Sequence, residues 1–167
     1  AVVERAVRHE EHDVVTPEPA LVPFRDPRWP ELSGVSFPAR VSLGKIAFEE
    51  SVLLTHTGLS GPAILQISSY WKPGDTIRID CGREFGLLRK KKSGSRELVK
   101  NALSETLPKR FAEYMAPDKA LHEMKDSDLA ELEARLHNWE VTPPDTMGFD
   151  KAEQDRRRQA WEAAGRK

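Results

Sequence analysis

The stretch from Leu53 to Ile67 constrains the fold of this chain more than any other part of the sequence. It begins as an apolar, β-favouring run, passes two glycines, Gly58 and Gly61, and then spaces its apolar residues as a helix does. Pro62 suits the first position of that helix, because its missing N–H would have no partner there. The sequence therefore predicts a strand, a sharp turn and a helix, with hydroxyls, a histidine and free backbone N–H groups at the turn.

Composition limits the classes of protein to which the chain can belong. The 167 residues are 38% hydrophobic and 32% charged, which suits one domain or two small ones with a charged surface. The 26 basic residues face 27 acidic ones, so an electrostatic role of the whole chain on nucleic acid is not expected. Cys81 is the single cysteine, which favours a reducing compartment, and no apolar run reaches the roughly 20 residues of a membrane helix. We therefore expect a cytoplasmic chain without a signal peptide.

Short alternating segments predict strands around the opening stretch. Val35 to Leu43 alternates between apolar and polar or small residues, and Pro38 within it indicates an edge or a bulge. Ile46 and Phe48 begin another strand, Glu49-Glu50-Ser51 is expected to form a polar bend, and Val52 to Thr55 returns as a strand before the helix predicted at 62–71. Thr76 to Asp80 adds a further strand after that helix. Several short strands in succession favour a small β-barrel over a parallel sheet.

Helical spacing replaces this pattern after about residue 82. Three short helices are predicted within 98–107, 108–116 and 126–136, where apolar residues recur at three- and four-residue intervals. The segment from Leu136 to Thr142 is β-like again, so this strand should rejoin the first layer and make the helical unit an insertion.

The predicted fold is α+β and has several parts. It is a small β-barrel with an inserted all-helical subdomain and no Rossmann domain in this chain. The barrel takes 17–82 plus 136–150 with one helix at 62–71, the helical subdomain takes 83–135, and 1–16 and 154–167 are peripheral segments.

Two charged runs invite a functional interpretation. His9-Glu10-Glu11-His12-Asp13 has its histidines three residues apart, whereas a zinc-protease helix needs them four apart, so we expect a solvated turn and no metal. Arg89 to Lys92, followed by Ser93-Gly94-Ser95, is typical of a basic, flexible linker. No aromatic residues interleave this run, so a solvated loop is expected rather than a nucleic-acid contact.

The segment from Gly58 to Pro62 is similar to the nucleophile elbow of hydrolases, Gly-x-Ser-x-Gly. Pro62 stands where the last glycine should be, and neither a parallel sheet nor a separate Asp/His pair is predicted. A serine hydrolase is therefore not expected. His56 could donate a hydrogen bond to a substrate or cofactor oxygen, or shuttle a proton near neutral pH, but it could also bond to a neighbouring carbonyl.

Several segments of the sequence resemble one family, the BaiN-like (aminoacetone-oxidase-like) flavoproteins, which are NAD(P)/FAD-dependent oxidoreductases. The most specific of them is the run Thr-His-x-Gly-Leu-Ser-Gly-Pro, and the resemblance spans about residues 17 to 153. The segments that carry it are Pro19 to Pro23, Glu31 to Gly34, Gly44 to Phe48, Leu54 to Trp71 and Leu136 to Trp139.

This resemblance implies an architecture. Members of the family have a Rossmann-type FAD domain that is split by an insert of a small β-barrel and an all-helical unit. This chain is similar to the insert, because it contains no Gly-x-Gly-x-x-Gly fingerprint and Gln154 to Lys167 does not resemble the family's C-terminal glycine-rich segment.

The resemblance also implies a function. It makes the chain the substrate-side or lid region of a flavin-dependent NAD(P)/FAD oxidoreductase, whose partners are the FAD-binding domain of the same polypeptide and a small-molecule substrate. We expect no FAD on this chain alone, no catalysis by it in isolation, and neither a membrane nor a nucleic-acid partner. The turn facing the substrate or the flavin comprises Thr55, His56, Thr57, Gly58, Ser60 and Gly61. The alternative is a free-standing protein- or RNA-binding module.

Overall fold

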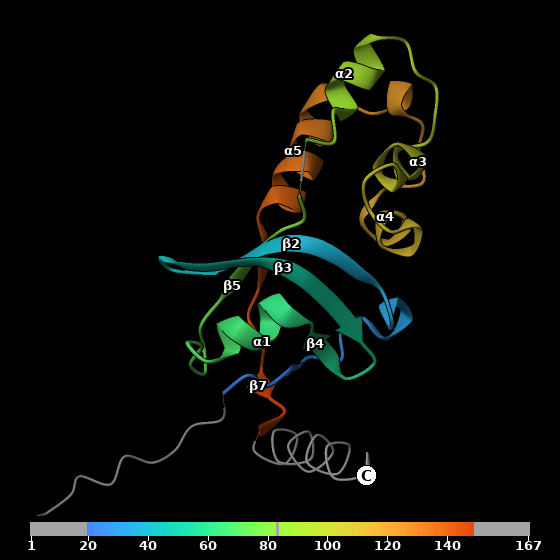
Figure 1. The fold of residues 1–167 in the computed structure, drawn as a ribbon. Coiled ribbons are helices and arrows are strands. Elements are labelled where there is room, and N and C mark those ends of the chain that lie inside the picture. Colours follow the sequence, from blue (N-terminus) through green and yellow to red (C-terminus); the bar gives the residue numbers. More distant parts are fainter. Residues whose placement is uncertain (1–19, 83, 149–167) are drawn as a thin grey trace, which may run out of the picture.

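A curved antiparallel sheet forms the centre of the described chain (Figure 1). The structure is a computed structural model that describes residues 20–82 and 84–148. Within them seven strands pair in the order β6-β5-β2-β3-β4-β1-β7, and every pair is antiparallel. The strands are β1 (Phe24–Arg25), β2 (Ser36–Leu43), β3 (Ile46–Thr55), β4 (Gly58–Ser60), β5 (Ile77–Asp80), β6 (Trp139–Val141) and β7 (Asp145–Thr146).

The predicted alternation of β2 is confirmed, because Phe37, Ala39 and Val41 are buried while the residues between them are exposed. β2 pairs with β3 along its whole length, but β5 pairs only with the segment Arg40 to Ser42. Pro38 therefore lies where β2 is locally an edge, and its missing N–H costs no ladder hydrogen bond.

The prediction of a barrel needs correction, because the hydrogen-bonded sheet is open among the described residues. β6 and β7 are the two ends of the strand order, yet only residues 142–144 join them along the chain. The four Cα–Cα steps from Val141 to Asp145 span about 14 Å at most, so the sheet curls until its two edges approach each other. Pro143 and Pro144 stand in this connection without N–H donors, and the strands beside them have only two or three residues, so no ladder closes the gap.

One helix lies against the sheet and the others form a separate unit beyond it (Figure 1). α1 (Pro62–Ser68) packs on β2 and β3 on the opposite side from that unit. It ends three residues before the predicted position 71, because Trp71 folds back and donates from Nε1 to the Asp75 carbonyl oxygen at 2.9 Å. The remaining elements are η1 (Pro30–Leu32), α2 (Leu87–Lys92), α3 (Val99–Ser104), α4 (Lys109–Met115), η2 (Leu121–Glu123) and α5 (Asp126–His137).

The three predicted short helices correspond to α3, α4 and α5. The return strand is also confirmed, since β6 pairs with β5 through Ile77 and Val141. The prediction of a flexible linker at 89–95 is wrong, because α2 occupies most of it. Glu133 Oε1 accepts a 2.6 Å hydrogen bond from the N–H of Leu87 and so satisfies a free donor at the start of this helix.

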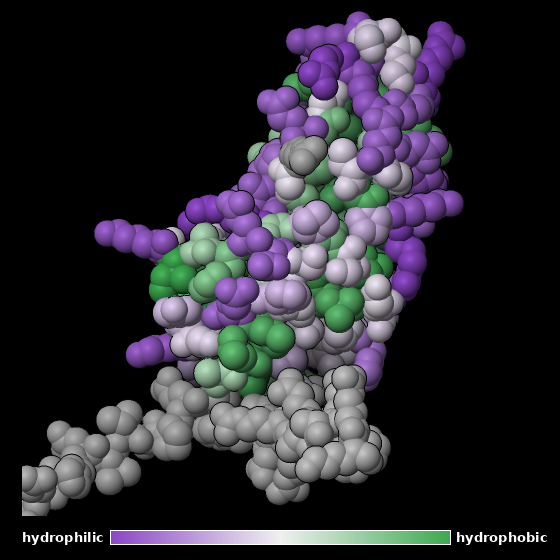
Figure 2. Space-filling model, viewed as in Figure 1, coloured by the Kyte–Doolittle hydropathy of each residue, from purple (hydrophilic) through white to green (hydrophobic). Residues whose placement is uncertain are grey.

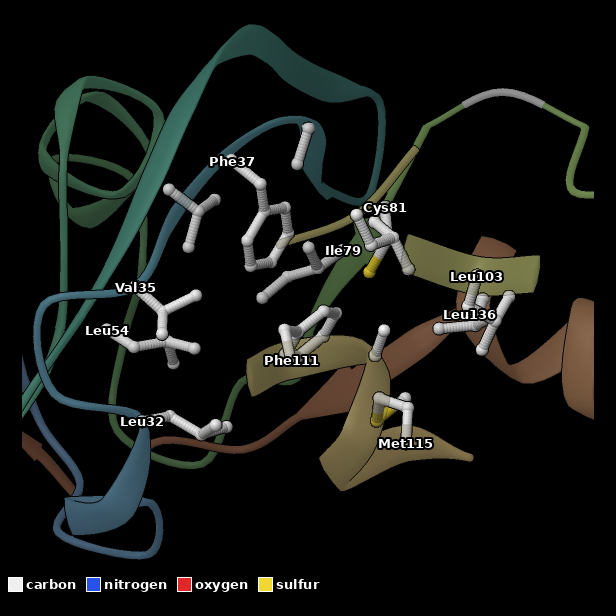
Figure 3. Packing of buried hydrophobic residues seen from close by; sticks show 14 of the residues in the cluster. Leu32, Val35, Phe37, Leu54, Ile79, Cys81, Leu103, Phe111, Met115 and Leu136 are labelled. Atoms are coloured by element: carbon white, nitrogen blue, oxygen red, sulfur yellow. The ribbon is translucent and has the colours of Figure 1, made fainter. Parts of the chain in front are cut away.

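Side chains from the sheet and from the helical unit share one hydrophobic cluster (Figure 3). Phe37 of β2 stacks on Phe111 of α4 with ring centroids 4.6 Å apart, and Phe111 also lies against Trp139 of β6. Cys81 is buried in the same cluster, and this burial raises the pKa of its thiol to about 12. The apolar contact fixes α4 beside the face of β2.

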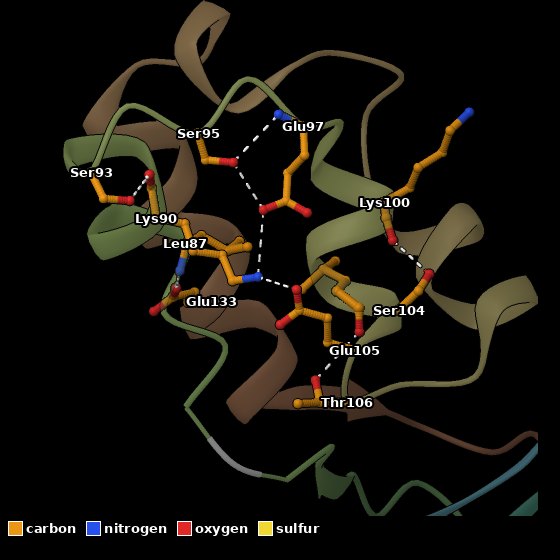
Figure 4. A network of polar contacts seen from close by, with 11 residues as sticks. Leu87, Lys90, Ser93, Ser95, Glu97, Lys100, Ser104, Glu105, Thr106 and Glu133 are labelled. Atoms are coloured by element: carbon orange, nitrogen blue, oxygen red, sulfur yellow. Dashed lines mark hydrogen bonds and ion pairs between the residues drawn. The ribbon is translucent and has the colours of Figure 1, made fainter.

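Polar contacts hold the far end of the helical unit together (Figure 4). Lys90 Nζ contacts Glu105 Oε1 at 2.5 Å and Glu97 Oε1 at 3.5 Å, which ties α2 to the segments around α3. Lys91 Nζ donates to the Met124 carbonyl oxygen and to Asp126 Oδ1, both at 2.6 Å. Two lysines of the basic run are therefore engaged within the chain.

Candidate functional site

A tight hairpin forms the predicted turn between β3 and β4. His56 and Thr57 are its two central residues, and Thr55 organises it through its hydroxyl group. Thr55 Oγ1 accepts a hydrogen bond from the Gly58 N–H at 3.0 Å, donates to the Gly58 carbonyl oxygen at 3.0 Å, and lies 3.2 Å from Thr57 Oγ1. Thr55 thus has a structural role at this turn.

Both glycines of the turn sit where another backbone segment leaves no room for a side chain. A Cβ at Gly58 would lie 2.1 Å from the Phe24 carbonyl oxygen, and a Cβ at Gly61 would lie 2.6 Å from the Ser51 carbonyl oxygen. Both also have positive φ, 150° and 92°, which glycine adopts without strain. Gly58 therefore lets β4 approach β1 closely, and Gly61 lets the start of α1 approach β3 closely.

Four of the six predicted site residues line one hollow of about 320 Å³: Thr55, His56, Thr57 and Ser60. His56 is exposed, while the three hydroxyl residues are half-buried. Gly58 and Gly61 are not among the lining residues. The structure therefore brings hydroxyl groups and an exposed imidazole to one concave surface, where they can form hydrogen bonds with a polar molecule.

Two further parts of the lining come from segments that the sequence reasoning did not assign to the site. Ser33 and Gly34 reach it because the Gly34 N–H donates to the Leu54 carbonyl oxygen at 2.8 Å and the Leu54 N–H donates to the Val35 carbonyl oxygen at 2.9 Å. The sequence shows that Ser33-Gly34 forms a turn, but it does not show that this turn pairs with Leu54.

The other lining residues mark where the described chain enters and leaves the sheet. Pro23 and Met147 both line the hollow, and the Met147 N–H donates to the Pro23 carbonyl oxygen at 2.8 Å. β1 and β7, which follow and precede these residues, are neighbouring strands. Both ends of the described chain therefore lie at the same end of the molecule, opposite the helical unit (Figure 1).

Other chemistries find no support in the described parts of the chain. All strand pairs there are antiparallel, which agrees with the rejection of a hydrolase elbow at Ser60. No group of three His, Cys, Asp or Glu side chains in 20–82 and 84–148 could hold a metal ion, and the run 9–13 lies outside these ranges. In the same ranges, no helix combines the length and apolar character needed to cross a bilayer.

An ion pair between a buried carboxylate and an exposed arginine lies next to the hairpin. Asp26, only 1% exposed, accepts two hydrogen bonds from Arg28: from Nε to Oδ1 at 2.7 Å and from Nη2 to Oδ2 at 2.5 Å. The backbone N–H of Asp26 also donates to the Thr57 carbonyl oxygen at 2.9 Å. The guanidinium lies 4.7 Å from the centre of the Trp29 ring, so Arg28 is held from two sides.

The chain is similar to two curated proteins, both called "Ribosomal RNA dihydrouridine synthase". The protein of Haemophilus influenzae is 34% identical over 155 residues, and that of Escherichia coli is 36% identical over 156 residues. Each alignment covers 84% of this chain but only 38% and 39% of the two relatives, so the chain spans less than two fifths of their length. Residues 18–154 match the family described as "HI0933-like protein barrel and H2TH domain". The chain therefore belongs to the HI0933-like family and corresponds to the insert region of the BaiN-like and aminoacetone-oxidase-like FAD oxidoreductases, as its sequence motifs indicated.

Proposed function

We propose that this chain forms the substrate-side wall of a flavin-dependent oxidoreductase that reduces uridine in ribosomal RNA. One observation carries the proposal: the hollow that contains His56 also contains Pro23 and Met147, where the chain enters and leaves the sheet. In the longer relatives, more polypeptide must join at this end. The turn from Thr55 to Gly61 would then face the FAD-binding domain of the same polypeptide.

The division of the chain follows the same logic. We infer that 17–82 and 136–150 form one unit and that 83–135 is inserted into it. The chain leaves the sheet after β5 and returns through α5 to β6, which pairs with β5. The chain thus leaves the sheet and returns to it on two neighbouring strands, which supports an inserted helical unit. In the same way, the pairing of β1 with β7 supports the proposal that the whole chain is an insert in a larger protein.

The residues of this chain do not fit a dinucleotide cofactor. Binding of FAD in a Rossmann domain uses a Gly-x-Gly-x-x-Gly loop between a strand and a helix, and the 167-residue sequence contains no such loop. We therefore expect this chain alone to bind no FAD. FAD and the nicotinamide would be held by the remaining polypeptide.

The substrate class comes from the relatives. Dihydrouridine is uridine with two added hydrogen atoms, so a synthase of this nucleoside performs a reduction, which suits an oxidoreductase. The sequence alone led us to expect a small-molecule substrate and no nucleic-acid partner. We now propose RNA as the substrate instead. The names of the two relatives support this change.

This chain would contribute orientation and shielding of the reacting base. A uracil carries two carbonyl oxygens and an N–H group, and His56, Thr57 and Ser60 offer donors and acceptors around the hollow. An enzyme that acts on a base must take it out of the stack and bind it in a pocket. The hydroxyl groups and the imidazole would hold such a base while the surrounding wall excludes water.

The test uses the full-length protein that contains this chain. The purified protein is incubated with ribosomal RNA lacking dihydrouridine and with NADH or NADPH, and the nucleosides are quantified by mass spectrometry. We expect FAD to copurify and dihydrouridine to accumulate with time. A flavin-loaded protein that forms no dihydrouridine with either nicotinamide would contradict the proposed substrate.

A free-standing RNA-binding module is the second candidate, because the names of the relatives also accommodate an RNA-binding role for this region. It differs in one measurable respect. A module would bind RNA as the isolated 167-residue chain with the affinity of the full-length protein, whereas a wall of a larger site would bind much more weakly alone.

A further inference from the structure

α4 presents a face to solvent beside the hollow. Phe111, Ala112 and Met115 are buried in the shared hydrophobic cluster, whereas Arg110 and Tyr114 lie one turn apart on the exposed face. The Tyr114 side chain is an exposed large hydrophobic group, with 46% of its surface accessible. In Figure 1, α4 lies above the turn η1, which is drawn in blue, and Arg110 of α4 donates to the Glu31 carbonyl oxygen in this turn.

Arg110 is a fixed cation on the path from α4 to the hollow. Its Nη1 donates to the Ser33 carbonyl oxygen at 3.0 Å, and its Nη2 donates to the Glu31 carbonyl oxygen. Carbonyl acceptors orient the guanidinium without neutralising its charge, and no carboxylate of the described segments forms an ion pair with it. Ser33 also lines the hollow, so the Arg110 charge stands at its margin.

Arg28 supplies a second guanidinium on the segment that leads into η1, the same turn whose Glu31 carbonyl oxygen accepts a hydrogen bond from Arg110. Its hydrogen bond with Asp26 raises its pKa, burial opposes this shift, and the charges of Asp26 and Tyr114 raise it further. Asp26 offsets the charge of Arg28, so the net positive charge of this surface comes mainly from Arg110. Arg28 still contributes a planar face and N–H donors that do not point at Asp26.

We propose that Arg28, Tyr114 and Arg110 form a binding surface for single-stranded RNA that leads into the hollow at His56. Nucleic-acid sites without duplex readout combine aromatic rings, on which bases stack, with arginines that contact phosphates and stack in turn. Tyr114 is exposed one helical turn from the oriented guanidinium of Arg110, and the oriented guanidinium of Arg28 lies on the segment before η1, so these residues meet this description. A base delivered into the hollow needs its neighbours in the strand to be supported outside it, and this surface lies where that support is required.

This surface deepens the proposed function and rests on it for the identity of the ligand. It also explains why the basic run 89–92 need not provide the RNA contact. Lys90 and Lys91 are engaged by carboxylates within the helical unit. Figure 2 shows hydrophilic residues gathered over that unit, but oppositely charged residues share this surface and reduce its attraction for phosphate.

The experiment measures RNA binding and turnover by the full-length protein. The binding probe is a fluorescently labelled single-stranded RNA of about 12 uridines, because one binding unit covers about 4–16 nucleotides. Fluorescence anisotropy gives its Kd for the unmodified protein, Tyr114→Ala and Arg110→Ala. The controls are Tyr70→Ala, another exposed tyrosine, and Lys109→Ala, an exposed cation on the same helix. Thermal melting establishes that every variant is folded.

We expect Tyr114→Ala to weaken binding about 10-fold, because loss of one stacked base has an effect of this order. Arg110→Ala should weaken it similarly and make binding less dependent on salt. Both variants should raise KM for RNA with little change in kcat, while the two controls bind as the unmodified protein does. A Tyr114→Phe variant should retain binding, since stacking needs the ring and not the hydroxyl.

Two failures are distinguishable. If the unmodified protein forms dihydrouridine but Tyr114→Ala and Arg110→Ala keep its Kd and KM, the proposed surface is wrong and the proposed function stands. If no dihydrouridine forms at all, the substrate proposal fails, and the anisotropy series still decides whether this surface binds RNA. Equal weakening by Lys109→Ala would also contradict the surface, because it would indicate a nonspecific effect of charge.

Discussion

Met147 donates a backbone hydrogen bond to Pro23 across 2.8 Å, although the whole described fold lies between these two residues in the sequence. They flank β7 and β1, which pair side by side, and both line the hollow that contains His56. This relationship connects the entry and exit of the chain with the motif by which its family is recognised. This relationship supports the proposal that the hollow faces the FAD-binding domain of a longer polypeptide.

The close approach at Gly58 predicts a large effect of a single methyl group. Gly58→Ala should destabilise the 167-residue chain by more than about 3 kcal/mol, because the new Cβ meets the Phe24 carbonyl oxygen and the positive φ adds strain. Gly74→Ala is the matched control, with φ +95° and no atom within 4 Å of the added Cβ. It should cost only about 1 kcal/mol. Urea denaturation of the two variants compares them directly, and equal losses would contradict this reading of β1 and β4.

Thr55 should stabilise the hairpin through its hydroxyl. Thr55→Val removes the donor and the acceptor that serve Gly58 while keeping the β-branched shape, and about 1–3 kcal/mol of the unfolding free energy should be lost. Thr57→Val is the control, because only the 3.2 Å contact between the two hydroxyls involves its side chain. Chemical denaturation should rank Thr55→Val well below Thr57→Val, and the reverse order would overturn the role given to Thr55.

The buried thiol of Cys81 should be unreactive in the folded chain. Burial, and to a lesser degree the charge of Asp80, raises its pKa to about 12 from 9.0, so almost no thiolate exists at pH 8. Because the folded state holds this proton more tightly, stability should decline as the pH rises from about 9 toward 12. Labelling with a thiol reagent at pH 8 should be slow until urea unfolds the chain. Rapid labelling of the native chain would contradict the burial.

Acid should loosen the helical unit through two exposed ion pairs. A hydrogen bond from Lys91 lowers the pKa of Asp126, and one from Lys100 lowers the pKa of Asp118, both from 3.8. A lowered folded-state pKa adds stability above the unfolded value, and this contribution is lost as the pH falls through the folded value. NMR titration should therefore find both carboxyls protonating below pH 3.8. Lys91→Met should return Asp126 alone to its ordinary range.

Sequence reasoning succeeded where one short segment determines the structure. Gly58, Gly61 and Pro62 dictate a turn and a helix start by their own backbone properties, and the apolar spacing of 126–136 is enough for α5. Four of the six candidate residues line one hollow because they lie within one hairpin, and their role there stays a prediction.

Sequence reasoning failed where contacts with residues distant in the sequence determine the local structure. α2 was expected to be a flexible linker because its lysines suggest solvent, whereas Glu97, Glu105 and Asp126 engage two of them. The open edge of the sheet depends on how short β6 and β7 are, which a pattern of alternation does not define. Likewise, only the pairing of residues 34 and 35 with Leu54 brings Ser33 to the hollow.

The most direct test of the central claim changes the hollow in the full-length protein and measures dihydrouridine. His56→Ala and Ser60→Ala should each lower the rate of dihydrouridine formation in ribosomal RNA by about 10-fold, since loss of one oriented hydrogen bond is worth about 1.4 kcal/mol. His122→Ala, an exposed histidine in η2, is the control and should leave the rate unchanged. Rates equal to that of the unmodified protein in both hollow variants, with FAD still bound, would contradict the account.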